Sequence, residues 1–289
     1  MCKDIDYDIV LAGPTAVGKT NLSIKLAKIF NMEIISADAS QVYKKLDIGT
    51  AKILPEEMEG IKHHLIDIVE PNDIYSVGRY YKNVNKILNE NKEKKFIITG
   101  GTGLYIDSIT EGMTDTPKVD INKRKELENK SLEELVEILK EKKLDTNIDL
   151  KNKVRVIRKI EKGNIEYKNI KGNDRKFLKI FLTRDRSILY ERINKRVDLM
   201  IEKGLLDEAF EVYKEYGNIV SSIGYKELNQ YFEKKINLDT AIDLIKRNSR
   251  RYAKRQFTWF RDKGYIVYNL DILSDEEIID DITKKICKK

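Results

Sequence analysis

Apolar and polar residues alternate along the first third of the chain in a pattern that predicts strands and helices in turn. Short apolar runs indicate strands over residues 6–13, 32–38, 63–69 and 94–101. Between these runs, residues 19–30 and 76–91 place apolar side chains at helical spacing. Strands that alternate with helices are typical of a parallel sheet flanked by helices, so we expect an α/β fold.

The alternation stops in the middle of the chain. Residues 121–143 and 147–163 are charged segments with helical spacing, and no strand is expected until the apolar run at residues 177–183. Helices then follow over 186–204, 205–217 and 238–261, with a last strand at 264–271 and a last helix at 274–286. We therefore expect a core formed by residues 1–113 and 176–289, with an all-helical insertion domain over residues 114–175.

The composition excludes some classes of protein. The 289 residues contain no uninterrupted apolar stretch near the length of a membrane span, and the first residues lack the apolar core of a secretory signal. We therefore expect a cytoplasmic protein without a membrane partner. The two cysteines, Cys2 and Cys287, form no C-x-x-C pair, which disfavours a zinc site and suggests two incidental thiols.

The stretch "GPTAVGKT" between the first strand and the first helix fits the pattern G-x-x-x-x-G-K-[ST] of a phosphate-binding loop. Its backbone N–H groups and the N-terminus of the following helix favour a diphosphate. We expect Lys19 to neutralise phosphate oxygens and the Thr20 hydroxyl to bind Mg²⁺. The pattern alone leaves open whether the loop holds a nucleoside triphosphate or another diphosphate ester. The predicted loop comprises Gly13, Pro14, Thr15, Ala16, Val17, Gly18, Lys19 and Thr20.

Two other strand ends carry candidate functional residues. Asp38 ends the second strand, and the carboxyl ends of neighbouring parallel strands line the ligand crevice of such a sheet. A carboxylate there could act as a general base or hold metal-bound water, and a cap of a following helix is an equally weighted alternative. Thr102, in the turn "TGGTGLY", is a candidate substrate contact, and the turn before Lys52 is consistent with a second binding loop.

The basic residues are concentrated near the C-terminus. The chain has a net charge of +7, and residues 246–261, "KRNSRRYAKRQFTWFR", contain no acidic side chain. Arg247, Arg251, Lys254 and Arg255 share one helical face, and Tyr252 and Trp259 can either stack on bases or pack in the core. This pattern favours a nucleic-acid backbone contact over an inert surface. Arg155 and Arg158 form a second basic face in the insertion.

Taken together, the motifs of this chain resemble those of bacterial tRNA dimethylallyltransferases, in the same order and over nearly the whole length. The motifs that carry the resemblance are "GPTAVGKT", "IISADASQVY", "LDIGTAK", "HHLIDI", "GGTGLY", "NKVRVIRKIE", "LYERINKRVDLMIEKGLLDE", "IGYKE" and "AKRQFTWFR".

The resemblance implies a fold of the P-loop NTPase type and a prenyl transfer to RNA. The family moves a dimethylallyl group from dimethylallyl diphosphate to N6 of the adenine 3′ of the anticodon (position 37), in tRNAs that read codons starting with U. The loop would then hold the diphosphate of the donor, with Asp38 as the base, Lys19 and Thr102 as further catalytic residues, and Mg²⁺ bound by Thr20. We expect a monomer that binds the tRNA anticodon arm and flips the adenine out of the stack.

The resemblance also assigns contacts to the tRNA. Residues of the Asp38 turn and Thr102 would contact the target nucleotide, and three further groups would contact the rest of the tRNA. The full set is Asp38, Ala39, Ser40, Gln41, Thr102, Arg124, Val154, Arg155, Val156, Ile157, Arg158, Lys254, Arg255, Gln256, Phe257, Thr258 and Trp259. The family commonly has Ser where this chain has Ala39, so the chain would either lose that hydroxyl contact or use Ser40 instead.

The sequence leaves three alternative functions open. A dimethylallyltransferase acting on free AMP, ADP or ATP shares the phosphate loop and the base, but it needs no large basic surface. A P-loop kinase would turn over ATP and place phosphate on an acceptor. An RNA-binding module without activity is disfavoured because Lys19 and Thr20 are intact.

Overall fold

The structure is a computed structural model that describes residues 5–115, 120–145 and 148–287. The chain forms two compact units, one of Met1–Glu111 with Gly172–Lys289 and the other of Gly112–Lys171. Each unit has its own buried core. The two units are therefore described separately.

The larger unit is built around a six-stranded sheet with the order β3-β2-β4-β1-β7-β8. All neighbouring strands in this sheet are parallel. Parallel strands covered on both faces are apolar throughout, and β1 is buried at every position. The strands are β1 (Asp8–Ala12), β2 (Glu33–Ala37), β3 (His63–His64), β4 (Phe96–Gly100), β7 (Phe177–Thr183) and β8 (Ile266–Asn269).

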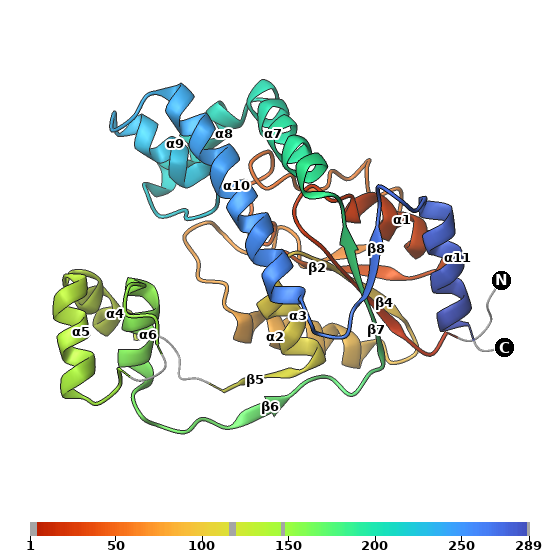
Figure 1. Cartoon of the computed structure of the whole chain (residues 1–289), viewed down its shortest axis with the longest axis horizontal. Helices are drawn as coiled ribbons and strands as arrows, with labels where there is room; N and C mark the ends of the chain where they lie inside the picture. The colour runs from red at the N-terminus through yellow and green to blue at the C-terminus, as the bar shows by residue number, and fades with distance from the viewer. Residues whose placement is uncertain (1–4, 116–119, 146–147, 288–289) are drawn as a thin grey trace. The chain divides into compact units, whose positions relative to one another are not determined.

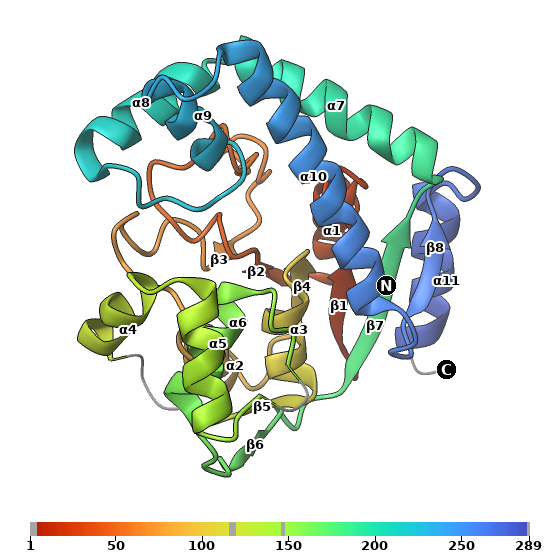
Figure 2. The ribbon, with the colours of Figure 1, turned by 60° about the vertical axis from the view of Figure 1, so that its left-hand side comes forward.

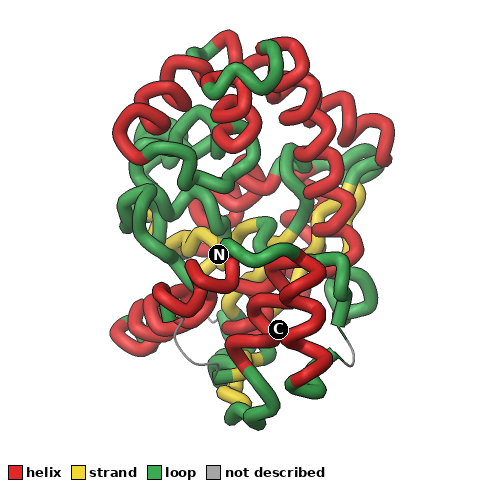
Figure 3. Tube along the Cα trace, turned by 90° about the vertical axis from the view of Figure 1, so that its left-hand side faces the viewer, coloured by secondary structure: helices red, strands yellow, loops and turns green. Residues whose placement is uncertain are grey.

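Helices cover both faces of the sheet (Figures 1 and 3). Because side chains alternate along a strand, Ile9 and Leu11 of β1 face one core, and Val10 and Ala12 face the other. The first core includes α1 (Lys19–Phe30) and α11 (Asp275–Ile286). The second includes α2 (Val77–Glu90) and α3 (Gly103–Thr110). This arrangement is the flanked parallel sheet that the alternation of apolar segments predicts.

The remaining helices of this unit are α7 (Arg186–Glu202), α8 (Leu205–Tyr216), α9 (Tyr225–Phe232) and α10 (Leu238–Phe260). A third core holds α8, α9 and the first half of α10 together, and α7 lies beside α10 (Figure 2). The sequence pattern predicts α7, α8 and α10, but α9 was not expected. Among the described helices, none combines the length and apolar character that a bilayer crossing requires.

Three neighbouring strands end at the same edge of the sheet. β1 leads into residues 13–20, β2 into Asp38, and β4 into the glycine turn before α3. Because β2, β4 and β1 are adjacent and parallel, their carboxyl ends bring these three segments together. The sheet topology thus assembles the candidate site from segments that are far apart in the sequence.

The strand expected over residues 63–69 is mostly absent. Only His63–His64 pairs with β2, because Leu65 and Asp67 have φ angles of 63° and 55° and the chain cannot stay extended there. The following residues pair instead with the turn after Asp38, where Ile68 donates to the carbonyl of Val42. The apolar residues of this segment therefore support that turn rather than lengthen the sheet.

The smaller unit contains α4 (Ile121–Glu128), α5 (Leu132–Glu141) and α6 (Lys153–Lys162). Leu127, Leu135, Leu139, Val156 and Ile160 are among the side chains that form its core. The unit also has a short antiparallel ribbon of β5 (Gly112–Thr114) and β6 (Asn169–Lys171). Helical spacing predicts the helices, but the ribbon strands of three residues are too short to stand out in the sequence.

The C-terminal cysteine differs from the expectation of an incidental thiol. Cys287, which follows α11, is disulfide-bonded, so that interpretation is wrong. Its backbone also forms an isolated antiparallel bridge with Ile5. Cys2 lies outside the described residues.

Candidate active site

The phosphate loop connects β1 to α1 in a conformation that needs glycine. Gly18 has a φ angle of 122°, which an L side chain rarely adopts. The Lys19 ammonium folds back over the loop and donates to the carbonyls of Gly13 and Pro14, at 2.8 Å each. The loop therefore presents a cation above its own backbone, close to where an anion would bind.

Two arginines hold the carbonyl oxygens of the loop. The Arg184 guanidinium donates to the carbonyl of Val17 at 2.9 Å, and that of Arg192 donates to the carbonyl of Ala16 at 3.0 Å. Arg184 is itself paired with Asp271. Within the described chain, the N–H groups of Ala16, Gly18, Lys19 and Thr20 donate no hydrogen bond. These N–H groups remain available for an anion, as in other anion-binding loops at helix N-termini.

Burial changes the charge of the loop lysine. It lowers the pKa of Lys19 to about 7, the nearby Asp38 carboxylate partly offsets this, and the Arg196 guanidinium lowers the pKa further. An ordinary lysine would keep its proton up to a much higher pH. The charge of Lys19 therefore depends on whether an anion is present near neutral pH.

Asp38 lies at the end of β2 and organises a turn. Its Oδ1 atom accepts hydrogen bonds from the N–H groups of Ser40 at 2.8 Å and Gln41 at 3.3 Å. No α-helix starts there, so the alternative of a helix cap is excluded. Since one oxygen fixes the carboxylate, the other is left for a ligand, and Asp38 lines two adjoining cavities.

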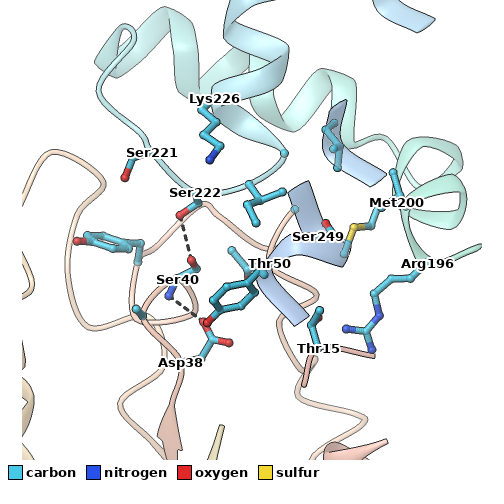
Figure 4. A pocket seen from close by; sticks show the side chains of 18 of the residues that line it. Thr15, Asp38, Ser40, Thr50, Arg196, Met200, Ser221, Ser222, Lys226 and Ser249 are labelled. Carbon is cyan, nitrogen blue, oxygen red and sulfur yellow. Dashed lines mark hydrogen bonds between the residues drawn. The ribbon is translucent and has the colours of Figure 1, made fainter. Parts of the chain in front are cut away.

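Two cavities share lining residues at the loop and at Asp38, and Figure 4 shows residues that line one of them. The first, of about 290 Å³, is lined by the phosphate loop and by Ser36, His63 and Thr99; we call it the loop cavity. The second, of about 460 Å³, extends between α7, α10 and the Asp38 turn; we call it the helix cavity. Both are lined by Thr15, Asp38, Thr50, Arg196 and Tyr252. A ligand with a charged end and an apolar end can span them.

The helix cavity contains residues that sequence reasoning missed. Arg196 extends from α7 toward Thr15 at the junction of the cavities (Figure 4), and burial lowers its pKa. Burial and the Asp38 carboxylate raise the pKa of Tyr252 to about 12, so its phenol stays protonated. Ser222 pairs its hydroxyl with that of Ser40 at 3.0 Å. Arg196 and Ser222 lie in or beside the family-like stretches "RINKR" and "IGYKE", which were the available signals.

The glycine turn after β4 packs tightly against the Asp38 turn. A Cβ atom at Gly100 would lie 2.2 Å from the carbonyl oxygen of Ala37, so only glycine allows this approach. The Thr102 hydroxyl accepts a hydrogen bond from the N–H of Ala39 at 3.0 Å. Thr102 thus supports the turn that carries Asp38, and Ala39 engages Thr102 through its backbone, a contact that does not need a serine side chain.

The predicted second binding loop is held by two charged side chains, Glu208 and the buried Lys52. The Glu208 carboxylate accepts from the N–H groups of Asp47, Ile48 and Gly49 at 2.8–3.1 Å. The ammonium of Lys52 is buried and bonds the Tyr43 carbonyl at 2.7 Å, together with the carboxylates of Asp47 and Asp67. The Lys52 side chain is therefore part of the support of this turn, whereas Gly49 and Thr50 of the same turn line the helix cavity.

The loop fits a divalent cation that arrives with a diphosphate. The Thr20 side chain is exposed at the start of α1 in the loop cavity, and it makes no hydrogen bond within the described residues. Among those residues, no cluster of three His, Cys, Asp or Glu side chains could hold a metal by itself. The Thr20 hydroxyl is therefore a donor that the loop offers to a divalent cation held by a diphosphate.

The predicted RNA contacts on α10 divide into two groups. Lys254, Arg255, Thr258 and Trp259 are exposed, as a contact requires. Gln256 is only 4% exposed, and the ring of Phe257 packs edge-to-face on Phe181. The helical repeat turns these two side chains toward the core, and their contact with tRNA stays a prediction.

The predicted contacts of the smaller unit divide in the same way. Val154 and Arg155 are exposed on α6, whereas Val156 and Ile157 are 0% and 3% exposed in the core. The side chains of Val156 and Ile157 therefore belong to the core of this unit, and their contact with tRNA stays a prediction. Two cations on this unit share one carboxylate, since Arg124 forms a bidentate pair with Glu161 at 2.6 Å and Arg158 approaches it at 3.2 Å.

Comparisons with known proteins agree with this geometry. A family model described as IPP transferase matches residues 41–263. The chain is 52% identical over 285 residues to a tRNA dimethylallyltransferase of Fusobacterium nucleatum subsp. nucleatum, with 94% of each chain covered. It is 44% identical over 282 residues to a tRNA dimethylallyltransferase of Bacillus subtilis, covering 90% of this chain and 89% of the other.

Solved structures give the same result. A tRNA isopentenylpyrophosphate transferase from Bacillus halodurans superposes with a TM-score of 0.75 at 39% identity, over 97% of each chain. A eukaryotic dimethylallyltransferase acting on tRNA superposes with a TM-score of 0.78 at 26% identity, over 98% of this chain and 81% of the other. By sequence and by fold, this chain belongs to the IPP transferase family.

Proposed function

We propose that this chain transfers a dimethylallyl group from dimethylallyl diphosphate to N6 of the adenine 3′ of the anticodon of tRNA. The products are N6-dimethylallyladenosine in the tRNA and diphosphate. One observation carries the proposal: the loop cavity and the helix cavity join at Asp38, so a donor held by its diphosphate presents its reactive carbon beside a carboxylate.

The loop cavity would bind and stabilise the diphosphate. The free N–H groups of the loop and the start of α1 provide fixed dipoles, and Lys19 provides a charge. Arg196, at the junction, would contact the oxygen that leaves C1 of the donor. These groups act where negative charge develops as the C1–O bond breaks, which is where preorganised electrostatics lower a barrier most.

Asp38 would act on the acceptor. The N6 amine of adenine is a poor nucleophile because its lone pair is delocalised into the ring, and it gains acidity as it attacks C1. As the N6–C1 bond forms and the C1–O bond breaks, one N6 proton passes to the free oxygen of Asp38. The turn built on Ser40 and Gln41 keeps the carboxylate oriented for this transfer.

Thr20 would hold Mg²⁺ with the diphosphate. The cation, when bound, adds positive charge beside the departing oxygens. Binding and orientation of the donor remain the work of the loop amides, Lys19 and Arg196.

The tRNA would meet the exposed cations of α10 and of α6. Lys254 and Arg255 precede Trp259, an exposed aromatic side chain, and Arg155 is exposed in the smaller unit. Charged residues beside an exposed ring suit an RNA loop with unstacked bases. We further propose that the chain binds the anticodon arm of tRNAs that read codons beginning with U. We also propose that it acts as a monomer in the cytoplasm.

The test supplies radiolabelled dimethylallyl diphosphate and Mg²⁺ to the purified protein. Parallel reactions contain an unmodified tRNA with adenine 3′ of the anticodon, AMP, or ATP without a prenyl donor. We expect label in the tRNA alone, recovered after digestion as N6-dimethylallyladenosine. Label in AMP would move the chain to mononucleotide prenylation, and ATP turnover without label would show that the loop holds a nucleotide.

A further inference from the structure

Gln256 joins the two glycine-containing loops of the active site. This side chain projects from α10, and its Oε1 atom accepts a hydrogen bond from the N–H of Thr15 at 2.9 Å. Its Nε2 atom donates to the carbonyl of Gly101 at 3.0 Å. A Cβ atom at Gly101 would lie 1.9 Å from that Nε2 atom, so the glycine makes room for the amide. Both polar ends of this buried side chain are thus held.

The hydrogen bond to Thr15 changes what the phosphate loop can bind. The N–H groups of Ala16, Gly18, Lys19 and Thr20 lead toward the start of α1 and are free of partners in the described residues. The N–H of Thr15 is the next donor on the other side, where the loop cavity meets the helix cavity. Gln256 removes this donor from the anion site and places a carbonyl oxygen there.

The same end of the cavity carries a second oxygen group. The Asp38 carboxylate lines the junction beside Thr15. A chain of three phosphates that continued from the loop toward this junction would find no free N–H at Thr15 and would face two oxygen groups. An uncharged carbon group at the junction of the cavities is not repelled by these oxygen groups, and it needs no hydrogen-bond donor. Arg196, also at the junction, can still neutralise a phosphate that ends there.

We propose that Gln256 is a specificity-determining residue that closes the phosphate loop to a third phosphate, so that the loop accepts a diphosphate with an apolar substituent and discriminates against a triphosphate. This inference deepens the proposed function and rests on it for the identity of the donor. It gives a physical reason why a loop with a nucleotide-binding pattern would not retain ATP.

The test measures competition by two simple anions. Inorganic pyrophosphate and inorganic tripolyphosphate are titrated against labelled dimethylallyl diphosphate bound to the full chain, at fixed Mg²⁺. The quantity of interest is the ratio of the two inhibition constants. Differences in charge and in Mg²⁺ binding between the two anions affect all variants equally, so they cancel when ratios are compared.

Gln256→Ala frees the Thr15 N–H and removes the facing oxygen. We expect the ratio of the tripolyphosphate to the pyrophosphate constant to fall roughly tenfold or more, the factor that one hydrogen bond to a charged group supplies. Gln256→Glu is the companion variant, because it keeps an acceptor at Thr15 and adds charge while it loses the donor to the Gly101 carbonyl. Its ratio should equal or exceed that of the wild type.

An unchanged ratio in Gln256→Ala would overturn the proposal. So would a wild-type protein that binds tripolyphosphate as tightly as pyrophosphate, a result that needs no variant to fold. If the protein discriminates between the two anions but transfers no prenyl group to tRNA, this inference stands and the proposed function fails. If it transfers the group to tRNA but does not discriminate, the proposed function stands and this inference fails.

Discussion

Because the charge of Lys19 changes near neutral pH, the affinity of the protein for dimethylallyl diphosphate should depend on pH. Equilibrium binding measures this dependence directly. In the free protein, burial lowers the pKa of this lysine to about 7, although the Asp38 carboxylate opposes the shift. A bound diphosphate would supply the missing opposite charge and return the pKa toward its ordinary value. The donor therefore binds the protonated form, and above neutral pH its binding requires the uptake of a proton.

The size of the effect follows from that pKa. The protonated fraction of Lys19 is about 90% at pH 6 and about 1% at pH 9 if the pKa is about 7. The apparent dissociation constant of dimethylallyl diphosphate should accordingly rise roughly tenfold or more between these values. The direction of this change follows from the raised pKa in the complex. The affinity for the donor is constant below the pKa that Lys19 has in the free protein, and it falls as the pH rises through that value.

The assay is equilibrium binding of labelled dimethylallyl diphosphate across this pH range. Lys19→Arg is the matched control, because a guanidinium keeps its charge throughout. Ionisation of the ligand itself is common to both proteins, so the ratio of their dissociation constants isolates the lysine. A ratio that stays constant from pH 6 to pH 9 would contradict the lowered pKa of Lys19. It would mean that Lys19 stays protonated in the free protein over this range.

Two further predictions concern α10. Gly103→Ala should displace Trp259, because the added Cβ atom would lie 2.1 Å from its ring, and the emission of this single tryptophan should shift to the red; an unchanged spectrum would contradict the packing. Arg255→Ala should weaken tRNA binding and reduce the salt slope by about 1. Arg186→Ala is its control, since Arg186 and Arg255 each lie over a tyrosine ring, at 5.2 Å and 5.5 Å. Equal salt slopes in the two variants would remove Arg255 from the tRNA contact.

Sequence reasoning reaches the parts of the site that local patterns encode. The phosphate loop needs a glycine with positive φ and a lysine at a fixed spacing, and both are visible in eight consecutive residues. Asp38 and Thr102 follow apolar runs, so the parallel sheet predicts that they lie at one edge. The amphipathic pattern of α10 likewise predicts which of its cations are exposed.

Other features depend on contacts between distant segments. Gln256 lies 241 residues from Thr15, and no spacing rule predicts their hydrogen bond. The sequence places Lys52 beside a candidate binding loop, but it does not show that the Lys52 ammonium pairs with Asp47 and Asp67. The strand predicted at residues 63–69 fails because Leu65 and Asp67 adopt positive φ angles, which no glycine marks in advance.

Family motifs do not show which of their residues are exposed. A motif marks a whole stretch as functional, but the helical repeat divides its members between solvent and core. In "AKRQFTWFR" this division separates Arg255 from Gln256 and Phe257, and in "NKVRVIRKIE" it separates Arg155 from Val156. The assignment of individual contacts therefore required the structure.

The most direct test of the central claim compares the wild type with Asp38→Asn in single-turnover transfer of labelled dimethylallyl to tRNA. An asparagine can still accept the hydrogen bonds from Ser40 and Gln41, so the turn should persist while the base is lost. We predict transfer at least roughly a hundredfold slower at saturating donor, with the dissociation constant for tRNA unchanged. A variant that transfers the label at the wild-type rate, or that loses only tRNA binding, would contradict the assignment of Asp38 as the base at the junction of the two cavities.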